Sequence, residues 1–281
     1  SMTKSPQSTW LRRVFSLAGL SMLITIPFAH AASALELEKH EPISMIINQS
    51  PWYAGFARTV QDYEDETGNK INLDVTPFVG VLEKIRNSIR APKGIYDIVP
   101  EWTSVMSSIM ATGLIEPLTN IDPDFKLDEG LCKYQDTAYW DFEKRSFSNT
   151  GELLGVPING NVQVLYYRED LYKEKGLEVP KTWDDLIENA KILNDPPNIY
   201  GMVQRADRTA IEYNFISYLY SQGGSYLKDA KNGDMTVTIN SPEAVKAMEI
   251  YLRLNREGGY PNPGSVTQGT MIQLLATGKA A

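Results

Sequence analysis

The chain has 281 residues, of which 42% are hydrophobic and 22% are charged, and its formal net charge at pH 7 is −8. This composition is sufficient to bury hydrophobic cores in up to about two domains, and it excludes a disordered chain. The negative charge gives no attraction to phosphate backbones or anionic lipid, so we expect no nucleic-acid partner. Cys132 is the single cysteine, which excludes an intrachain disulfide and a cysteine-based metal cluster.

The N-terminal segment has the features of a signal peptide. Ser1 before the first methionine indicates a cloning remnant, and basic residues then precede an apolar run at 14–29. Small residues around Ala31 and Ala34 provide two cleavage sites, so we assign residues 1–34 to a signal peptide. The run is short for a permanent membrane anchor, and no cysteine that could carry a lipid follows it. We therefore expect a protein exported to the periplasm that is neither membrane-anchored nor a lipoprotein.

Strands and helices alternate along the first half of the remaining chain. Apolar alternation predicts the strands, and pairs such as Ser50-Pro51 predict where helices begin. The predicted strands lie at 43–48, 71–78 and 96–102, and the predicted helices run from Ser50 to Gly68, around 82–89 and from Thr103 to Gly113. This order implies right-handed crossovers and a mostly parallel sheet with helices on both faces, which is one α/β lobe.

The second half repeats this pattern. Thr182 and Asp185 have the spacing of a capping box at the start of a helix. The predicted strands lie at 162–168, 198–205 and 235–240, and the predicted helices start at Thr182, Thr209 and Ser241. We therefore predict two α/β lobes, at 35–157 and 158–281.

The sequence VPINGN lies where these two lobes meet. Gly155 and Gly160 permit wide backbone angles, and Pro157 with the polar side chains keeps the segment out of a sheet interior. We predict a hinge crossover near 157–161. An ordinary loop inside one lobe is the alternative.

Several stretches together resemble one protein family. They are GELLGVPINGNVQVLYYREDLYKEKGLEVPKTWDDLIENAKIL, FARTVQDYEDETGNKINLDV, YDIVPEW, GLIEPLT, SQGGSYL, TINSPEAVKAMEIYLRL and LLATGKAA. The chain is similar to the extracellular solute-binding proteins of ABC importers, especially the carbohydrate-binding group that includes the maltose-binding protein. The resemblance implies a two-lobed periplasmic-binding-protein-like fold that closes on a sugar or oligosaccharide and delivers it to a membrane permease. It also implies a monomer without a cofactor and without catalysis.

The C-terminal end departs from this family. In the family, the element resembling Gly-Lys-Ala-Ala continues into a further strand, a binding loop, return crossings to the first lobe and C-terminal helices. Here the sequence stops at Ala281, so we expect an incomplete second lobe in a C-terminally truncated chain. A naturally short receptor is the alternative.

Candidate ligand-binding residues follow the predicted strands. Ligands of open α/β sheets bind beyond the carboxyl ends of strands, and amides, carboxylates and aromatic rings suit sugar hydroxyls and C–H faces. This rule selects Asn48, Gln49 and Trp52 after the first strand and Glu101 and Trp102 after the third.

The family resemblance implies two further contacts, Asn161 and Tyr213, and proximity adds Asn159 and Arg205. Arg205 and Arg208 would admit an acidic sugar if they face the cleft. The aromatic residues could instead be core side chains, and Glu101 could be a solvated carboxylate. Trp140 and Trp183 are expected to be structural.

Two other functions stay open on the sequence. A secreted glycoside-active enzyme could use Glu101 with Glu152 or Asp141 as an acid/base pair. The only histidines are His30 and His40, in or near the signal peptide, and the sequence has no nucleophile elbow or phosphate loop. A sensory sugar-binding module without transport is the other alternative.

Overall fold

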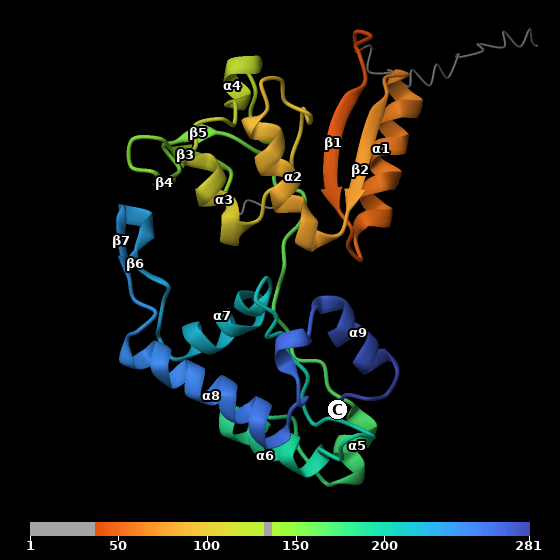
Figure 1. The fold of residues 1–281 in the computed structure, drawn as a ribbon, viewed down its shortest axis with the longest axis vertical. Coiled ribbons are helices and arrows are strands. Elements are labelled where there is room, and N and C mark those ends of the chain that lie inside the picture. Colours follow the sequence, from red (N-terminus) through yellow and green to blue (C-terminus); the bar gives the residue numbers. More distant parts are fainter. Residues whose placement is uncertain (1–36, 132–136) are drawn as a thin grey trace, which may run out of the picture.

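The computed structural model describes residues 37–131 and 137–281. Its elements form two groups (Figure 1): β1 to β5 with α1 to α4, and α5 to α9 with β6 and β7. The predicted signal peptide and Cys132 lie outside the described residues.

The first group is organised around two parallel strands. β1 (Ile43–Asn48) pairs with β2 (Ile71–Thr76) from Ile43 opposite Ile71 to Asn48 opposite Thr76, and α1 (Tyr53–Thr67) is the crossover between them. α1 ends at Gly68, whose φ of 67° is readily adopted by glycine. The predicted strand at 43–48 and the predicted helix end at Gly68 are therefore confirmed.

Two longer helices and a short one complete this side of the molecule, namely α2 (Phe78–Arg90), α3 (Thr103–Met110) and α4 (Leu118–Ile121). The core contains Ile46 from β1, Val81 and Ile85 from α2, and Ile109 from α3. The apolar stripe predicted around 82–89 thus faces the strands.

The strand predicted at 96–102 is wrong. Only Ile98 forms a bridge, parallel to Met45 of β1, although the Asp97 N–H donates to the Ser44 carbonyl at 2.8 Å. Pro100 has no N–H to continue such a ladder, so the segment runs beside β1 without forming a strand.

A small antiparallel sheet follows, in the order β4–β3–β5. Its strands are β3 (Tyr139–Asp141), β4 (Ser146–Phe147) and β5 (Glu152–Leu153). Trp140 of β3 is 1% exposed and packs with Met106 and Met110 of α3. Its predicted structural role is confirmed.

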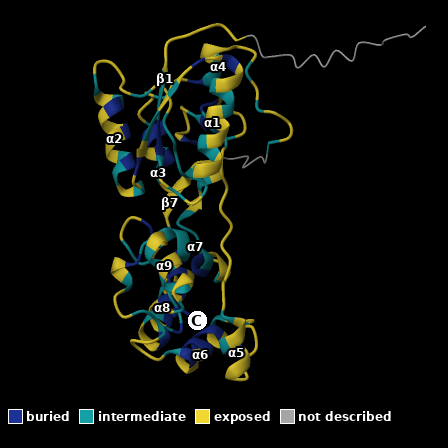
Figure 2. Cartoon of the chain, turned by 90° about the vertical axis from the view of Figure 1, so that its right-hand side faces the viewer, coloured by how far each residue is buried: buried dark blue, intermediate teal, exposed yellow. Residues whose placement is uncertain are grey.

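An extended, exposed connection leads from the first group to the second. Residues 158–167 are all exposed, and they form the long trace between the two groups in Figure 2. The strand predicted at 162–168 is wrong. A strand requires a hydrogen-bonded neighbour, and in the described part of the chain no strand lies beside this segment. Its end is held by a backbone bond of 2.8 Å from the Arg168 N–H to the Ala281 carbonyl.

The second group is mainly helical. It contains α5 (Glu169–Glu174), α6 (Trp183–Leu193), α7 (Ile211–Ser221), α8 (Pro242–Gly258) and α9 (Gln268–Ala276). The main core lies between α6, α7 and α8, where Ile187, Leu219 and Leu254 are each completely buried. Helix periodicity places these apolar residues on facing stripes.

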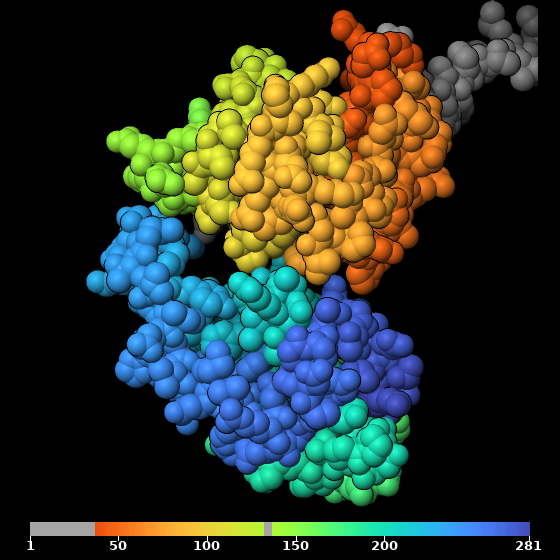
Figure 3. Space-filling view, viewed as in Figure 1, coloured from red at the N-terminus to blue at the C-terminus, as the bar shows by residue number. Residues whose placement is uncertain are grey.

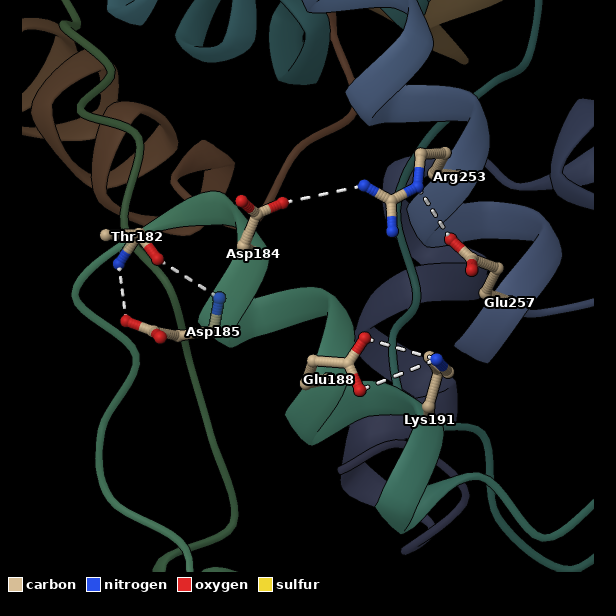
Figure 4. A network of polar contacts seen from close by, with 7 residues as sticks. All are labelled: Thr182, Asp184, Asp185, Glu188, Lys191, Arg253 and Glu257. Carbon is tan, nitrogen blue, oxygen red and sulfur yellow. Dashed lines mark hydrogen bonds and ion pairs between the residues drawn. The ribbon is translucent and has the colours of Figure 1, made fainter.

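The start of α6 confirms the predicted capping box (Figure 4). The Thr182 hydroxyl accepts the Asp185 N–H at 3.1 Å, and the Asp185 carboxylate accepts the Thr182 N–H at 3.0 Å. On the outer side of the same helix, Asp184 lies 3.5 Å from Arg253 of α8, which also binds Glu257 at 3.0 Å. These exposed ion pairs contribute little stability compared with the apolar contacts between α6 and α8.

The strand predicted at 198–205 is also wrong, because this segment forms only single bridges. Tyr200 is bridged in parallel to Ala280, and Met202 to Gly259. At Gly201 the backbone passes so close to α6 that an added Cβ would lie 1.9 Å from the Ala190 carbonyl oxygen. The segment is therefore extended and packed, but it is too irregular for a ladder.

The strand predicted at 235–240 is partly confirmed as a hairpin arm that reaches the first group. β7 (Asp234–Val237) pairs antiparallel with β6 (Leu227–Asp229), and the short turn η1 (Ala230–Asn232) between them lies against β4. Figure 3 shows this arm beside the antiparallel sheet of the first group. The two groups are therefore in contact at a point other than the connection. A second short turn, η2 (Pro263–Ser265), precedes α9.

Candidate functional site

A cavity of about 380 Å³ lies where the carboxyl ends of β1 and β2 face α9. Its walls are Gln49, Ser50, Pro51, Pro77, Phe78, Gln268, Gly269 and Ile272. The Gln49 N–H donates to the Thr76 carbonyl at 2.8 Å, so the two strand ends are held side by side. The cavity therefore takes one wall from each group of elements, at the edge of the sheet where α/β proteins bind ligands.

A row of aromatic rings crosses between the groups next to this cavity. The Phe78 ring centroid lies 4.8 Å from that of Trp102 and 6.4 Å from that of Tyr213. Phe78 and Trp102 belong to the first group and Tyr213 to α7 of the second. Phe78 thus belongs both to the cavity wall and to the aromatic row, so the two features form one cleft.

Glu101 directly precedes Trp102 of this row in the sequence, and its carboxyl group is buried. Both of its carboxyl oxygens are buried and have no hydrogen-bond partner among the described residues. Burial raises the pKa of Glu101 to about 8, although the charge of Arg86 opposes the shift. Glu101 is therefore mainly protonated at neutral pH and can donate a hydrogen bond.

Four predicted site residues come together in the cleft. Gln49 lines the cavity, Trp102 and Tyr213 belong to the aromatic row, and the guanidinium carbon of Arg205 lies 5.1 Å from the Tyr213 ring centroid. Asn48 is paired with Thr76 at the strand end.

Three other predicted residues do not join them. The Trp52 ring packs edge-on against Phe56 of its own helix α1, with centroids 5.9 Å apart. Asn159 and Asn161 hydrogen-bond each other at 3.3 Å on the exposed connection. In this structure none of the three lines the cavity between the groups.

Several cleft residues were missing from the sequence prediction. Phe78 follows the carboxyl end of β2 through Pro77, so the rule that selected Gln49 after β1 would have found it. Gln268 and Ile272 lie on α9, far along the chain, and reach the cavity only through the arrangement of the two groups. No local signal in the sequence marks them.

The proposed catalytic pair gains no support from the geometry. The Asp141 carboxylate accepts the N–H groups of Glu143 and Lys144 at 3.0 and 2.9 Å, and Glu152 is exposed on β5. Within residues 37–131 and 137–281 no carboxylate is hydrogen-bonded to Glu101. The arrangement is that of a binding cleft, in which polar groups and rings converge on a concave surface.

Residues 37–131 and 137–281 contain no group of three or more His, Cys, Asp or Glu side chains that could hold a metal ion. No helix among them has the length and apolar character needed to cross a membrane.

Comparison with known proteins agrees with this architecture. The family model described as bacterial extracellular solute-binding protein matches residues 47–281. The chain belongs to this family. The family and the two-lobed fold inferred from the sequence resemblance are therefore confirmed.

This solute-binding protein is similar to two curated relatives that are named after the small compounds they bind. It is 23% identical over 256 residues to the erythritol/L-threitol-binding protein of Mycolicibacterium smegmatis, which covers 83% of this chain and 53% of that protein. It is 25% identical over 263 residues to the sn-glycerol-3-phosphate-binding periplasmic protein UgpB of Escherichia coli, covering 90% and 55%. The chain thus spans about half the length of these relatives.

Solved structures show the same fold. A solute-binding protein of Agrobacterium radiobacter K84 in complex with ribitol matches with a TM-score of 0.69 and 24% identity, covering 86% of this chain and 59% of that one. The maltose-bound MalE3 of T. maritima matches with a TM-score of 0.65 and 19% identity, covering 86% and 60%.

Proposed function

We propose that this solute-binding protein captures a sugar or polyol in the cleft between its two lobes, at 35–157 and 158–281. The observation that carries the proposal is the cavity whose walls come from both groups of elements. Its amide side chain at Gln49 suits hydroxyl groups, and the rings of Phe78, Trp102 and Tyr213 suit the C–H face of a carbon chain or sugar ring. The erythritol/L-threitol-binding relative and the ribitol-bound structure support this class of solute.

The full-length protein delivers this solute to the permease of an ABC importer. It works in the periplasm as a monomer, without a lipid anchor and without chemistry of its own. Family membership supports this role, because the relatives and matching structures are described as binding proteins, several of them of ABC transporters.

A thermal-shift screen of the full-length mature protein tests the proposal. The compounds are erythritol, ribitol, mannitol, glucose and maltose, with amino acids and polyamines as the contrasting set. A ligand that binds only the folded state increases the free energy of unfolding and so raises the melting temperature. At a ligand concentration of a hundred times its Kd, the stabilisation is about 2.7 kcal/mol. We expect a shift with at least one sugar or polyol. A response to amino acids or polyamines alone would contradict the proposal.

A further inference from the structure

The backbone of Arg205 is fixed on both sides. Its N–H donates to the Asn214 Oδ1 atom at 2.7 Å, and its carbonyl accepts a hydrogen bond from the Tyr251 hydroxyl. Asn214 belongs to α7, and Tyr251 belongs to α8 and is 2% exposed. The starting point of the Arg205 side chain is therefore set by the helical core of the second group.

The side chain of Arg205 reaches Tyr213 of the aromatic row. The guanidinium carbon lies 5.1 Å from the Tyr213 ring centroid, within the range of a cation–π interaction. Tyr213 is the ring that meets Phe78 of the first group. The Arg205 charge is thus held at the boundary between the two groups, beside the cleft.

This charge has no counter-ion in the described residues. The Nε atom of Arg205 is buried without a hydrogen-bond partner, and no carboxylate there forms an ion pair with the guanidinium. Burial lowers the pKa of Arg205, and Tyr213 and Glu212 oppose this shift only through their electrostatic fields. A partly desolvated cation of this kind is costly unless an anion pairs with it.

We infer that Arg205 binds an anionic group of the solute, so that the ligand of the cleft is a sugar or polyol carrying a phosphate or a carboxylate. The planar fork of the guanidinium suits both groups, because it can form two parallel hydrogen bonds to their oxygens. The carbon skeleton of the solute then lies against Tyr213 and Phe78. This inference rests on the proposed sugar or polyol function of the same cleft.

Matched neutral and anionic compounds test the inference in the full-length protein. The probes are ribitol with ribitol 5-phosphate and glucose with glucuronate, titrated calorimetrically at low and high salt. We expect at least one anion to bind about tenfold or more tightly than its neutral counterpart, with a preference that weakens as salt rises. The two pairs also show whether phosphate or carboxylate is preferred.

Three variants assign the preference to Arg205. Arg205→Gln should remove the difference between anion and neutral compound by weakening the binding of the anion about tenfold or more. Arg205→Lys keeps a cation but not the fork, so it should retain a reduced preference. Arg256→Gln is the matched control, because it removes an exposed arginine from the last turn of α8 and should change nothing.

The outcomes separate the two proposals. Equal or tighter binding of the neutral compounds by the unaltered protein overturns the inference and leaves the sugar or polyol function in place. An anion preference that survives in Arg205→Gln overturns it as well. Failure of every sugar, polyol and anionic derivative to bind overturns the proposed function itself. If Arg205→Gln does not fold, Arg205→Lys and the comparison in the unaltered protein still decide the result.

Discussion

The Trp183 ring stacks on the Tyr218 ring with their centroids 4.0 Å apart and their planes 19° from parallel. Trp183 begins α6 and Tyr218 belongs to α7, and the indole N–H also donates to the Ser221 hydroxyl at 2.7 Å. Tyr218 in turn meets Tyr251 of α8 edge-on at 5.1 Å. One chain of rings therefore joins the three helices that form the core of the second group.

Replacing Trp183 should loosen this core. Trp183→Ala removes the stacked ring and should lower the free energy of unfolding by about 3 kcal/mol. Trp183→Phe keeps a ring and loses the hydrogen bond to Ser221, so it should cost about 1 kcal/mol. Urea unfolding followed by circular dichroism measures both values. Equal values for the two variants would mean that the stacked ring contributes nothing.

A pair of glycine variants tests how closely the 198–205 segment approaches α6. Gly201→Ala places a Cβ 1.9 Å from the Ala190 carbonyl oxygen, so the backbone must shift, and we expect a loss of about 2 kcal/mol. Gly55→Ala is the control, because a Cβ there meets nothing within 4 Å and alanine favours the helix α1. It should stabilise the protein by about 0.5–1 kcal/mol. Thermal unfolding of both variants should therefore move the melting temperature in opposite directions.

Helix boundaries could be predicted because their signals are local. Gly68, the Thr182 and Asp185 pair, and Ser241 before Pro242 each act within a few residues, and the structure has a helix end or start at each. Strands also need a hydrogen-bonded neighbour, which can be distant in sequence. The alternation at 162–168 describes a side-chain pattern that suits a strand, but it does not say which segment would pair with it, and that prediction was wrong.

The site could be predicted only as far as local rules reach. Gln49 and Trp102 follow segments that lie side by side, so the rule about strand ends found them. The same rule would have included Phe78 after β2. Gln268 joins the cavity because α9 faces β1 across the cleft, which depends on how two separate groups of elements meet.

The buried acid Glu101 should make stability depend on pH. Burial raises its pKa from 4.5 to about 8, so the folded protein keeps a proton that the unfolded chain releases. The stabilising contribution is complete below about pH 4.5, and it is lost as the pH rises toward 8, at up to about 1.4 kcal/mol per pH unit.

Urea unfolding at several pH values checks this dependence. Glu101→Gln stays neutral at every pH and should remove the slope between pH 5 and 8. Glu83→Gln removes an exposed carboxylate from α2 and should keep the slope. An unchanged pH dependence in Glu101→Gln would show that this carboxyl is not the source.

Two tryptophan variants distinguish a ligand contact from a packing residue. Trp102→Ala should weaken binding of the best sugar or polyol from the thermal screen by about tenfold or more, because its ring packs at a tilt against Phe78 in the cleft. It should also lower the melting temperature, since Trp102 packs against the core around Ile46. Trp52→Ala should keep the affinity within about threefold, because that ring contacts Phe56 instead. Calorimetric titration gives both affinities, and a larger loss in Trp52→Ala would reverse the assignment.

The exposed connection predicts how the two groups move when a solute binds. Residues 158–167 are all exposed, and in the described chain two side-chain contacts tie them to the second group: the bond of 3.2 Å from the Asn214 amide to Gln163, and the Tyr167 ring 5.0 Å from that of Tyr172. A segment with so few packed contacts can change its backbone angles at low cost, whereas the helical core and the β1–β2 layer cannot. We therefore expect the full-length protein to close about a hinge near 157–161 when it binds a solute, with each group nearly rigid.

X-ray scattering should show a smaller radius of gyration at saturating solute. The Trp102→Ala variant, at a solute concentration that saturates only the unaltered protein, should keep the larger radius. An identical scattering profile with and without saturating solute would mean instead that the cleft is preformed and that the connection does not act as a hinge.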